Sequence, residues 1–383
     1  MGLTIAFNGQ RLAGQRLGVG RYIEYMLRHW VRQLGPDEEL SLFLRRPLED
    51  DLRLLHPKLH PVLLESGMSG IPWENLRLRG PASKTDVLFC PAYTGPIAYG
   101  GKMVVATHSV NEVHPEIHTD LKEQLYVKLF RHCARRADRV IVPAAVTRDA
   151  VMEQYGVPSE RIAIIPQGAD DVFQPVTDPE ILRAVRMKYF GADRPYLLFV
   201  GKCSVRRNIP MLVRAFAELK ATHKIPHGLL LFGPNQHGLP LEELCRELGV
   251  TGDVVQTDGK VDKHSDLVPI YAGADVFVHP STFEGWSITT VEAMACGTAV
   301  VAADRGGLGE VARGHALMIA DPTVDALVDA IARVLGDDAL RRDLQVRARA
   351  RGQALSWSVI TKQTLQVVRD VARGSQSLDP SPT

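Results

Sequence analysis

Short, continuous runs of apolar residues recur along the sequence, and they constrain the fold more than any other feature. Unbroken runs of Val, Ile, Leu and Phe are typical of parallel strands that are buried on both faces of a sheet. Several segments between the runs have helical spacing, and an alternation of strands and helices predicts an α/β fold with parallel sheets. The runs that predict strands are residues 4–8, 41–44, 86–90, 103–107, 139–142, 162–165, 196–200, 228–232, 275–279 and 298–302.

The chain of 383 residues is too long for one ordinary core and suits two domains of about 150–200 residues. A segment rich in proline and glycine, residues 166–195, marks a linker between them. We expect two Rossmann-like domains, 1–172 and 173–356, that face each other across a cleft. The helix at 357–373 is expected to pack back on the first domain, and the tail at 374–383 to be disordered. Ligands of open parallel sheets bind beyond the carboxyl ends of the strands, so functional residues should follow strands.

The composition argues against several classes of protein. The formal net charge is +1, so nothing in the chain as a whole points to nucleic acid. The five cysteines form no CxxC pair and have no zinc-ligand spacing, which suits reduced thiols in a cytoplasmic protein. The start MGLTIAFNGQ lacks the features of a signal peptide, and no apolar run approaches the roughly 20 residues of a membrane span. We expect a soluble protein in the cytoplasm or at the inner face of the membrane.

The strongest signal for a functional site is the segment 279–307, which reads HPSTFEGWSITTVEAMACGTAVVAADRGG. Glu284 is expected where a loop meets a helix, and Glu292 one or two turns into that helix. Carboxylates so placed can accept hydrogen bonds from a donor hexose and from a ribose, while the helix start near 286–289 offers backbone N–H groups to a diphosphate. The alternative is a glutamate at a helix start and a second, solvated glutamate on the helix.

A basic loop follows the expected strand at 196–200. It begins with Gly201 and Lys202 and continues to Arg206 and Arg207. Two cations on a loop at a strand end can neutralise a pyrophosphate leaving group. We assign this role to Lys202 and Arg207, with Arg206 as the competing candidate; the alternative is a solvated basic loop.

Two further candidates follow strands of the first half. The turn that contains Gly18 and Gly20 lets the backbone come close to a phosphate or an acceptor. It lacks the full GxGxxG pattern, so a nicotinamide site is weakly supported. His108 follows the strand at 103–107 and is expected to point into the cleft, although a lone histidine is more often a satisfied structural residue. His114 is a weaker alternative.

The segment 279–307 resembles the signature of the large family-four group of retaining GT-B glycosyltransferases, which includes bacterial mannosyl- and glucosyltransferases and whose usual form is close to PSxxEGFGLPxLEAMAxGxPVV. Trp286, Ser287 and Thr289 depart from this form, and Ser287 replaces a glycine beside the donor sugar, which could alter donor choice. The similarity is specific in 260–310 and weaker elsewhere. The matching residues are Pro280, Ser281, Glu284, Gly285, Glu292, Ala293, Met294, Ala295, Gly297, Val300 and Val301.

The resemblance implies a GT-B fold and transfer of a hexose from a nucleotide diphosphate sugar, of the GDP-mannose or UDP-hexose type, with retention of configuration. The acceptor would be a hydroxyl of a glycan, glycolipid or small molecule. No metal or cofactor is expected, because the sugar nucleotide is a substrate. The implied catalytic residues are Lys202, Arg207, Glu284 and His108. The implied donor-binding residues are Gly18, Gly20, Gly201, Val261, Gly285, Trp286, Ser287, Ile288, Thr289 and Glu292.

Two other functions remain open at this point. A sugar-nucleotide 2-epimerase can have the same two-domain fold, but it needs acid–base carboxylates beside C2 of the sugar. A non-catalytic sugar-nucleotide binding subunit is the second alternative. Both glutamates and both cations are present, which argues against loss of activity.

The helix expected at 120–139 carries a basic stripe beside an apolar one. A basic stripe can hold a protein weakly on anionic lipid. The favoured alternative is an ordinary amphipathic helix, with its leucines in the core and its arginines in solvent. The basic residues are Lys128, Arg131, Arg135 and Arg139, and the apolar residues are Leu121, Leu125 and Leu129.

Overall fold

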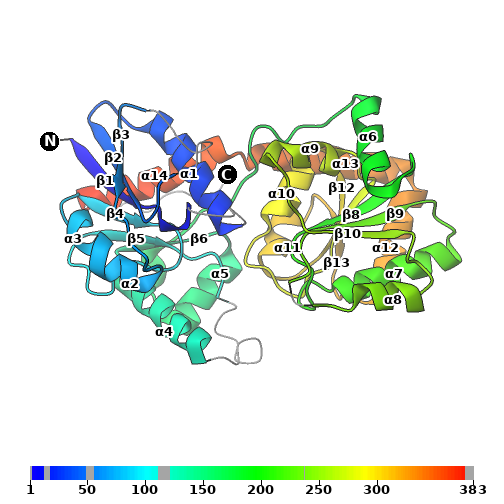
Figure 1. The fold of residues 1–383 in the computed structure, drawn as a ribbon, viewed down its shortest axis with the longest axis horizontal. Coiled ribbons are helices and arrows are strands. Elements are labelled where there is room, and N and C mark those ends of the chain that lie inside the picture. Colours follow the sequence, from blue (N-terminus) through cyan, green and yellow to red (C-terminus); the bar gives the residue numbers. More distant parts are fainter. Residues whose placement is uncertain (1, 13–17, 49–55, 111–120, 237, 376–383) are drawn as a thin grey trace. The chain divides into compact units, whose positions relative to one another are not determined.

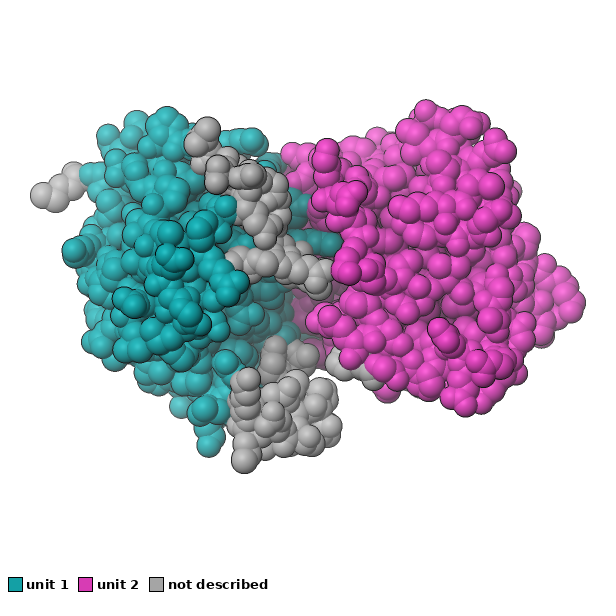
Figure 2. All heavy atoms as spheres, in the orientation of Figure 1, with its two compact units in different colours: residues 1–167, 357–383 teal, residues 168–356 magenta. Residues whose placement is uncertain are grey.

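The computed structural model describes residues 2–12, 18–48, 56–110, 121–236 and 238–375, without the side chains of 121–124. The chain divides into two compact units (Figure 2). Unit 1 consists of Met1–Gln167 and Trp357–Thr383, and unit 2 of Gly168–Ser356. Each unit is a parallel sheet with helices on both of its faces (Figure 1), so the expected α/β fold with two Rossmann-like halves is confirmed.

Unit 1 has a seven-stranded sheet in the order β3-β2-β1-β4-β5-β6-β7, with every neighbouring pair parallel. Its strands are β1 (Leu3–Asn8), β2 (Glu38–Leu44), β3 (Leu59–Leu63), β4 (Val87–Cys90), β5 (Met103–Ala106), β6 (Arg139–Val142) and β7 (Ile162–Ile164). Its main helices are α1 (Val19–Gln33), α2 (Ile71–Trp73), α3 (Arg79–Ala82), α4 (Leu121–Arg136), α5 (Ala145–Ala150) and α14 (Trp357–Arg373). The central strands β4 and β5 are buried along their whole length, as expected for apolar runs inside a parallel sheet.

The last helix, α14, packs against α1 within unit 1 (Figure 1). The ring of Trp357 is fully buried and stacks on Tyr25 with ring centroids 5.4 Å apart. Trp30 donates its indole N–H to the carbonyl oxygen of Thr361 at 3.0 Å. Because buried aromatic rings contribute large apolar areas, these contacts hold the C-terminal helix firmly on the first sheet's helical layer.

Unit 2 has a six-stranded parallel sheet in the order β10-β9-β8-β11-β12-β13. Its strands are β8 (Tyr196–Val200), β9 (Gly228–Phe232), β10 (Val254–Thr257), β11 (Val276–His279), β12 (Ala299–Ala303) and β13 (Leu317–Ile319). Its helices are α6 (Pro179–Phe190), α7 (Ile209–Thr222), α8 (Leu241–Glu247), α9 (Val268–Ala272), α10 (Ile288–Ala295), α11 (Gly306–Ala312), α12 (Val324–Gly336) and α13 (Asp338–Ala354). One apolar core lies between the sheet and the helices α7 and α12.

Strand order reverses once in each sheet. In unit 2 the chain runs outward from β8 to β10 and then returns to β11 on the other side of β8. In unit 1 the same reversal separates β1 from β4. The loops that leave two such strands diverge and open a crevice at the carboxyl ends, which is where open α/β sheets bind ligands.

The basic helix expected at 120–139 corresponds to α4, which ends at Arg136; Arg139 begins β6, so its expected place in the basic stripe of the helix is wrong. Its inner face is formed by three buried residues, Phe130, Cys133 and Ala134. Leu125 is 57% exposed, so the expectation that the leucines face the core is wrong for this residue. Arg135 donates its Nε–H to the carbonyl oxygen of Tyr155, so the basic stripe is not wholly solvated. Contact between this helix and anionic lipid stays a prediction; no helix that the structure describes is long and apolar enough to cross a bilayer.

A buried carboxylate lies at the point of reversal in unit 1. Glu74 is 1% exposed, and its Oε1 accepts hydrogen bonds from Asn8 Nδ2 at 2.8 Å, Gln10 Nε2 at 2.6 Å and Thr94 Oγ1 at 3.0 Å. Asn8 ends β1, Gln10 follows β1 and Thr94 follows β4, so Glu74 links the carboxyl ends of both strands to its own helical segment. Burial raises the pKa of Glu74, and the hydrogen bonds from Asn8 and Thr94 oppose that effect only in part.

We expect opposite outcomes for two substitutions of Glu74. Glu74→Ala leaves three buried donors without an acceptor and should lower the free energy of unfolding by about 3 kcal/mol. Glu74→Gln keeps the accepting oxygen and removes the cost of burying a charge. A folded-state pKa above the unfolded value of about 4.3 means that wild-type stability falls as pH rises through the raised pKa. Urea unfolding from pH 4 to 8 should therefore show that the free energy of unfolding of Glu74→Gln increases relative to that of the wild type as pH rises. A difference between the two proteins that does not change with pH would contradict this.

Candidate active site

Two loops meet at the carboxyl ends of β8 and β11, on either side of the reversal in unit 2. The first loop spans residues 201–208 and the second spans 280–287. Asn208 donates its side-chain N–H to the carbonyl oxygen of Pro280 at 2.7 Å, and Thr282 donates its backbone N–H to the carbonyl oxygen of Arg206 at 2.9 Å. The two segments that the sequence singled out are therefore one structural unit.

Glu284 is the acidic centre of these two loops. Its carboxylate is 3.2 Å from Arg207 through Oε1 and 3.2 Å from Arg206 through Oε2, and Ser281 donates its hydroxyl to Oε1 at 3.3 Å. Burial raises the pKa of Glu284, but His279 and the two guanidinium groups outweigh it and hold the pKa far below its usual range. Glu284 is therefore an ionised carboxylate with a cation on each oxygen.

The helix that follows, α10, begins at Ile288, so Glu284 lies in the loop, four positions before the first helical residue. Ser287 is the N-cap residue of α10, and its hydroxyl accepts a hydrogen bond from the backbone N–H of Thr290 at 3.2 Å. Ile288 and Thr289 form the first turn, where backbone N–H groups precede the first intrahelical bonds. Ser287 is buried, so its hydroxyl serves the helix start.

Glu292 lies just over one turn into α10 and is 0% exposed. Its Oε2 accepts a hydrogen bond from the hydroxyl of Tyr271 at 2.7 Å, and its Oε1 is 3.1 Å from Nε2 of His264. The alternative of a solvated helix glutamate is therefore wrong. A fully buried carboxylate with two polar partners is costly to place and is typical of a functional or tightly structured position.

The basic loop holds its three cations in different ways. The side chain of Lys202 is exposed. Arg207 donates to the carbonyl oxygen of Lys202 at 3.0 Å as well as to Glu284, and Arg206 donates to the carbonyl oxygen of Phe283. Because both arginines contact Glu284, this contact does not show which of them is the second cation for the pyrophosphate. The contact to Phe283 gives Arg206 an additional role in shaping the second loop.

Glycines bring the loop backbones together along this edge of the sheet. A Cβ atom on Gly233, after β9, would lie 1.9 Å from the carbonyl oxygen of Gly201, whose φ of +145° also favours glycine. A Cβ atom on Gly259, after β10, would lie 2.8 Å from Cα of Gly233. The half-buried Val261 follows on the same loop. The carboxyl ends of β8, β9 and β10 thus form a surface of closely packed backbone.

A second close approach lies beside Glu284. A Cβ atom on Gly307 would lie 2.0 Å from the carbonyl oxygen of Gly285, and Gly307 donates its N–H to the carbonyl oxygen of Glu284 at 2.7 Å. Gly285 is buried and Trp286 half-buried. The loop that carries Glu284 is fixed by backbone contacts, which limits its freedom to move.

The candidates of the first half lie in unit 1. His108 Nε2 is 2.8 Å from the carbonyl oxygen of Pro91, and its Nδ1 is 2.6 Å from the side-chain amide of Gln167. Burial lowers the pKa of His108 to about 4, so the ring is neutral at physiological pH. A substrate contact would have to replace one of these partners, and the catalytic role of His108 stays a prediction. His114 lies outside the described residues.

The glycine turn of unit 1 stands at the start of α1. Gly18 is the N-cap residue, with a φ of +45°, and nothing lies within 4 Å of a Cβ atom built on it. Gly20, within the first turn of the helix, is buried. The described part of this turn offers a helix start without a side-chain cap, which is compatible with approach of an anion.

His279 and Tyr271 had no predicted role, although both contact the acidic residues of the site. His279 is the last residue of β11, and a histidine that ends an otherwise apolar strand is a signal that could have identified it. Tyr271 carries no such signal, because a tyrosine within a short apolar helix reads as a core residue.

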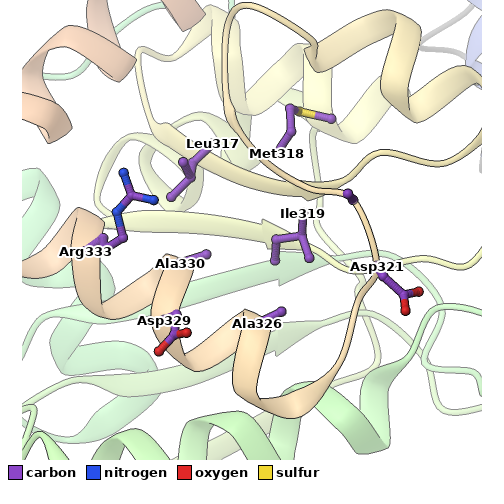
Figure 3. A pocket seen from close by; sticks show the side chains of 9 residues that line it. Leu317, Met318, Ile319, Asp321, Ala326, Asp329, Ala330 and Arg333 are labelled. Atoms are coloured by element: carbon purple, nitrogen blue, oxygen red, sulfur yellow. The ribbon is translucent and has the colours of Figure 1, made fainter.

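Two other features of unit 2 do not add to the site. A hollow of about 250 Å³ lies between the edge strand β13 and α12 (Figure 3). It is lined mainly by aliphatic side chains and belongs to the sheet edge. Asp170 accepts a hydrogen bond from the backbone N–H of Val172 at 3.0 Å and forms a turn. Within the described residues, no group of three or more His, Cys, Asp or Glu side chains is placed to hold a metal ion.

Two protein-family models match the chain. The model described as "Glycosyl transferases group 1" matches residues 186–351, and the model described as "Glycosyltransferase Family 4" matches residues 17–173. Together they account for most of the sequence. The chain belongs to the family 4 glycosyltransferases. The resemblance read from residues 279–307 is thereby confirmed at the level of the family.

Relatives of this glycosyltransferase carry related descriptions. It is 29% identical to O-antigen chain mannosyltransferase B of Escherichia coli over 258 residues, which are 67% of this chain and 66% of the relative. It is 33% identical to the D-inositol 3-phosphate glycosyltransferase of Nocardia farcinica over 231 residues, which are 58% of this chain and 50% of the relative. The chain therefore spans between half and two-thirds of the length of these relatives.

The fold of the glycosyltransferase is that of solved GT-B structures. Anabaena HepE, solved in complex with UDP-glucose, superposes with a TM-score of 0.74 at 18% identity, over 96% of this chain and 100% of that chain. At such identity the likeness concerns the fold alone, and the GT-B fold implied by the sequence is confirmed.

Proposed function

We propose that this glycosyltransferase transfers a hexose from a nucleotide diphosphate sugar, of the GDP-mannose or UDP-hexose type, to a hydroxyl of a glycan, glycolipid or small molecule, with retention of configuration. The observation that carries the proposal is the meeting of the Glu284 loop with the Lys202–Arg207 loop at the reversal of the second sheet. This places a carboxylate for sugar hydroxyls beside cations for a diphosphate. The mannosyltransferase description of a relative that is 29% identical supports the donor class.

Each residue has one part in the proposed reaction. The β-phosphate of the donor sugar lies against Lys202, Arg207 and the N–H groups at the start of α10. The anomeric C–O bond breaks as negative charge grows on the departing phosphate, and the acceptor hydroxyl attacks from the same face. The departing phosphate takes the acceptor's proton, so the enzyme supplies position and electrostatic stabilisation and needs neither a strong base nor a metal ion.

Ligand-induced stabilisation tests the proposed donor. Thermal-shift measurements with UDP, GDP, ADP and TDP should show a clear increase of Tm for one of them, because a ligand that binds only the folded state stabilises it. Hydrolysis of the matching sugar nucleotide, followed by NMR of the released sugar, then separates the candidates. Slow hydrolysis with retained configuration, also in EDTA, supports the transferase. Binding without hydrolysis indicates a binding subunit, and a changed configuration at C2 indicates an epimerase.

Glu292 is the proposed acceptor for the ribose hydroxyls. We expect Glu292→Gln to weaken binding of the nucleoside diphosphate about 10-fold, the effect of one charge-assisted hydrogen bond. It should also abolish discrimination against the 2′-deoxy nucleotide. Calorimetry measures the dissociation constants of the nucleoside diphosphate and of its 2′-deoxy analogue.

Tyr271→Phe is the matched control for Glu292→Gln. It removes the buried hydrogen bond to Glu292 Oε2 but leaves the carboxylate in place. Equal losses of affinity in the two variants, or wild-type affinity in Glu292→Gln, would assign Glu292 to the packing of α9 against α10 and not to the ribose.

A further inference from the structure

His279 lies between the start of α10 and the carboxylate of Glu284. The ring is 3% exposed. On one side, Nδ1 is 3.0 Å from the hydroxyl of Thr290 and 3.1 Å from the hydroxyl of Ser287. On the other side, Nε2 is 3.7 Å from Oε1 of Glu284 and has no hydrogen-bond partner among the described residues. One nitrogen is thus fixed, and the other faces an ionised carboxylate.

The surroundings of the ring determine its tautomer. Glu284 is ionised, so it can only accept a hydrogen bond, and Nε2 must carry the proton that faces it. In the neutral ring Nδ1 is then an acceptor, and the hydroxyls of Ser287 and Thr290 can donate to it. The hydroxyl of Ser287 already accepts the backbone N–H of Thr290, which leaves its hydrogen available for donation. Burial lowers the pKa of His279, in agreement with a neutral ring.

Donor binding changes which partners the carboxylate of Glu284 has. Both oxygens of its carboxylate are paired, with Arg206 and with Arg207, and Arg207 is also one of the two cations proposed to bind the diphosphate. When an arginine turns to the phosphate, the buried carboxylate loses a partner, and an unpaired buried carboxylate is strongly disfavoured. A neutral N–H donor nearby satisfies it without competing for the phosphate.

We propose that His279 is a positioning residue that holds Glu284 in its sugar-binding orientation, by donating from Nε2 to Oε1 when the donor draws Arg207 away from that oxygen. The hydroxyls of Ser287 and Thr290 set the tautomer that makes this possible. This inference rests on the proposed function. It explains why a serine stands at position 287: its hydroxyl joins the helix start to the histidine behind the acidic residue.

The first test is spectroscopic and does not require activity. In the full-length protein labelled with ¹⁵N-histidine, the ring nitrogens of His279, assigned by loss of the signal in His279→Leu, should show the Nε2–H tautomer. Glu284→Gln should shift the Nε2 resonance, and the double variant Ser287→Ala/Thr290→Val should convert part of the ring to the other tautomer. An Nδ1–H tautomer, or a resonance insensitive to Glu284→Gln, would overturn the proposal.

The second test separates positioning from folding. His279→Leu should bind the free nucleoside diphosphate within about two-fold of wild type, yet hydrolyse the sugar nucleotide about 10- to 100-fold more slowly, the effect of one hydrogen bond to a charged group. His279→Gln, which keeps an N–H donor, should recover part of the rate. His227→Gln, at another buried histidine of unit 2 that precedes β9, is the control and should change neither quantity.

The outcomes distinguish failure of the positioning role of His279 from failure of the proposed function. Equal loss of nucleotide affinity and turnover in His279→Leu, with a lowered Tm, would make the residue structural and overturn the positioning role. Wild-type turnover in His279→Leu would overturn it as well. If the wild-type protein neither binds nor hydrolyses any sugar nucleotide, the proposed function fails, while the tautomer and its dependence on Glu284 still decide whether His279 anchors that carboxylate.

Discussion

Alanine at Lys202 or at Arg207 should slow sugar transfer by about 10²-fold or more in each case, equivalent to about 2.7 kcal/mol of lost transition-state stabilisation. Negative charge grows on the departing phosphate as the anomeric bond breaks, and these cations follow β8 at the point where that phosphate is proposed to lie. Because the charge is larger in the transition state than in the bound donor, the loss should fall mainly on kcat. Steady-state rates of donor hydrolysis measure it before the acceptor is known.

Two variants control for charge and for loop structure. Arg214→Ala removes an exposed cation from α7, outside the loop, and should leave kcat unchanged. Arg206→Ala removes the contact to the carbonyl oxygen of Phe283, so we expect a lowered Tm and a smaller loss of rate than in Arg207→Ala. If Arg206→Ala is the damaging change and Arg207→Ala is silent, the assignment within the loop is off by one residue. Unchanged rates in Lys202→Ala would leave that side chain as a solvated lysine.

The strands that the sequence missed all lie at sheet edges, although the edge strand β7 was predicted. The central strands were predicted within a few residues, because burial on both faces demands unbroken apolar runs. The missed strands β3, β10 and β13 are all edge strands. An edge strand can be short and partly exposed, as in β3, where His60 and Pro61 are both exposed. Such a segment lacks the apolar run on which the prediction depended.

The sequence predicted which polar residues form the site, but it did not predict which of them contact each other. Both loops follow strands, and the rule that ligands bind at carboxyl strand ends was enough to place Glu284 and Arg207 on the same edge of a sheet. That the two side chains pair depends on strand order, which brings β8 beside β11 although Arg207 and Glu284 are 77 positions apart in the sequence. No local pattern encodes that neighbour relation, so the network around Glu284 required the structure.

Ser287 departs from the family pattern, and the structure gives this serine a local role that the sequence did not predict. Its position beside the donor sugar suggested a change in donor choice. The structure instead places the hydroxyl at the start of α10, in contact with His279 and Thr290. A serine is among the best N-cap residues, and this local reason competes with any role in substrate choice. A change of donor specificity at Ser287 stays a prediction, which the same hydrolysis assay with several sugar nucleotides can test in Ser287→Gly.

Glu284→Gln should have effects of opposite sign on two quantities. The amide accepts hydrogen bonds from sugar hydroxyls more weakly than a carboxylate and cannot hold the charge-assisted geometry, so we expect hydrolysis of the sugar nucleotide to slow by about 10²- to 10³-fold. Discrimination between sugars on the same nucleotide should weaken as well. The free nucleoside diphosphate should bind as tightly as to wild type or several-fold more tightly, because Arg207 no longer has to leave a carboxylate to reach it.

The pH dependence of the free energy of unfolding tests the lowered pKa of Glu284 independently. The pKa of Glu284 in the folded protein lies below the unfolded value of about 4.3, so its stabilising effect is present above that pH and is lost as pH falls. The wild type should therefore be more stable than Glu284→Gln at pH 7, with the difference fading below about pH 4. Glu243→Gln, on the exposed face of α8, should show no such difference. Weaker nucleotide binding in Glu284→Gln would contradict the competition between Glu284 and the phosphate for Arg207, because it would mean that the carboxylate holds this arginine in its binding position.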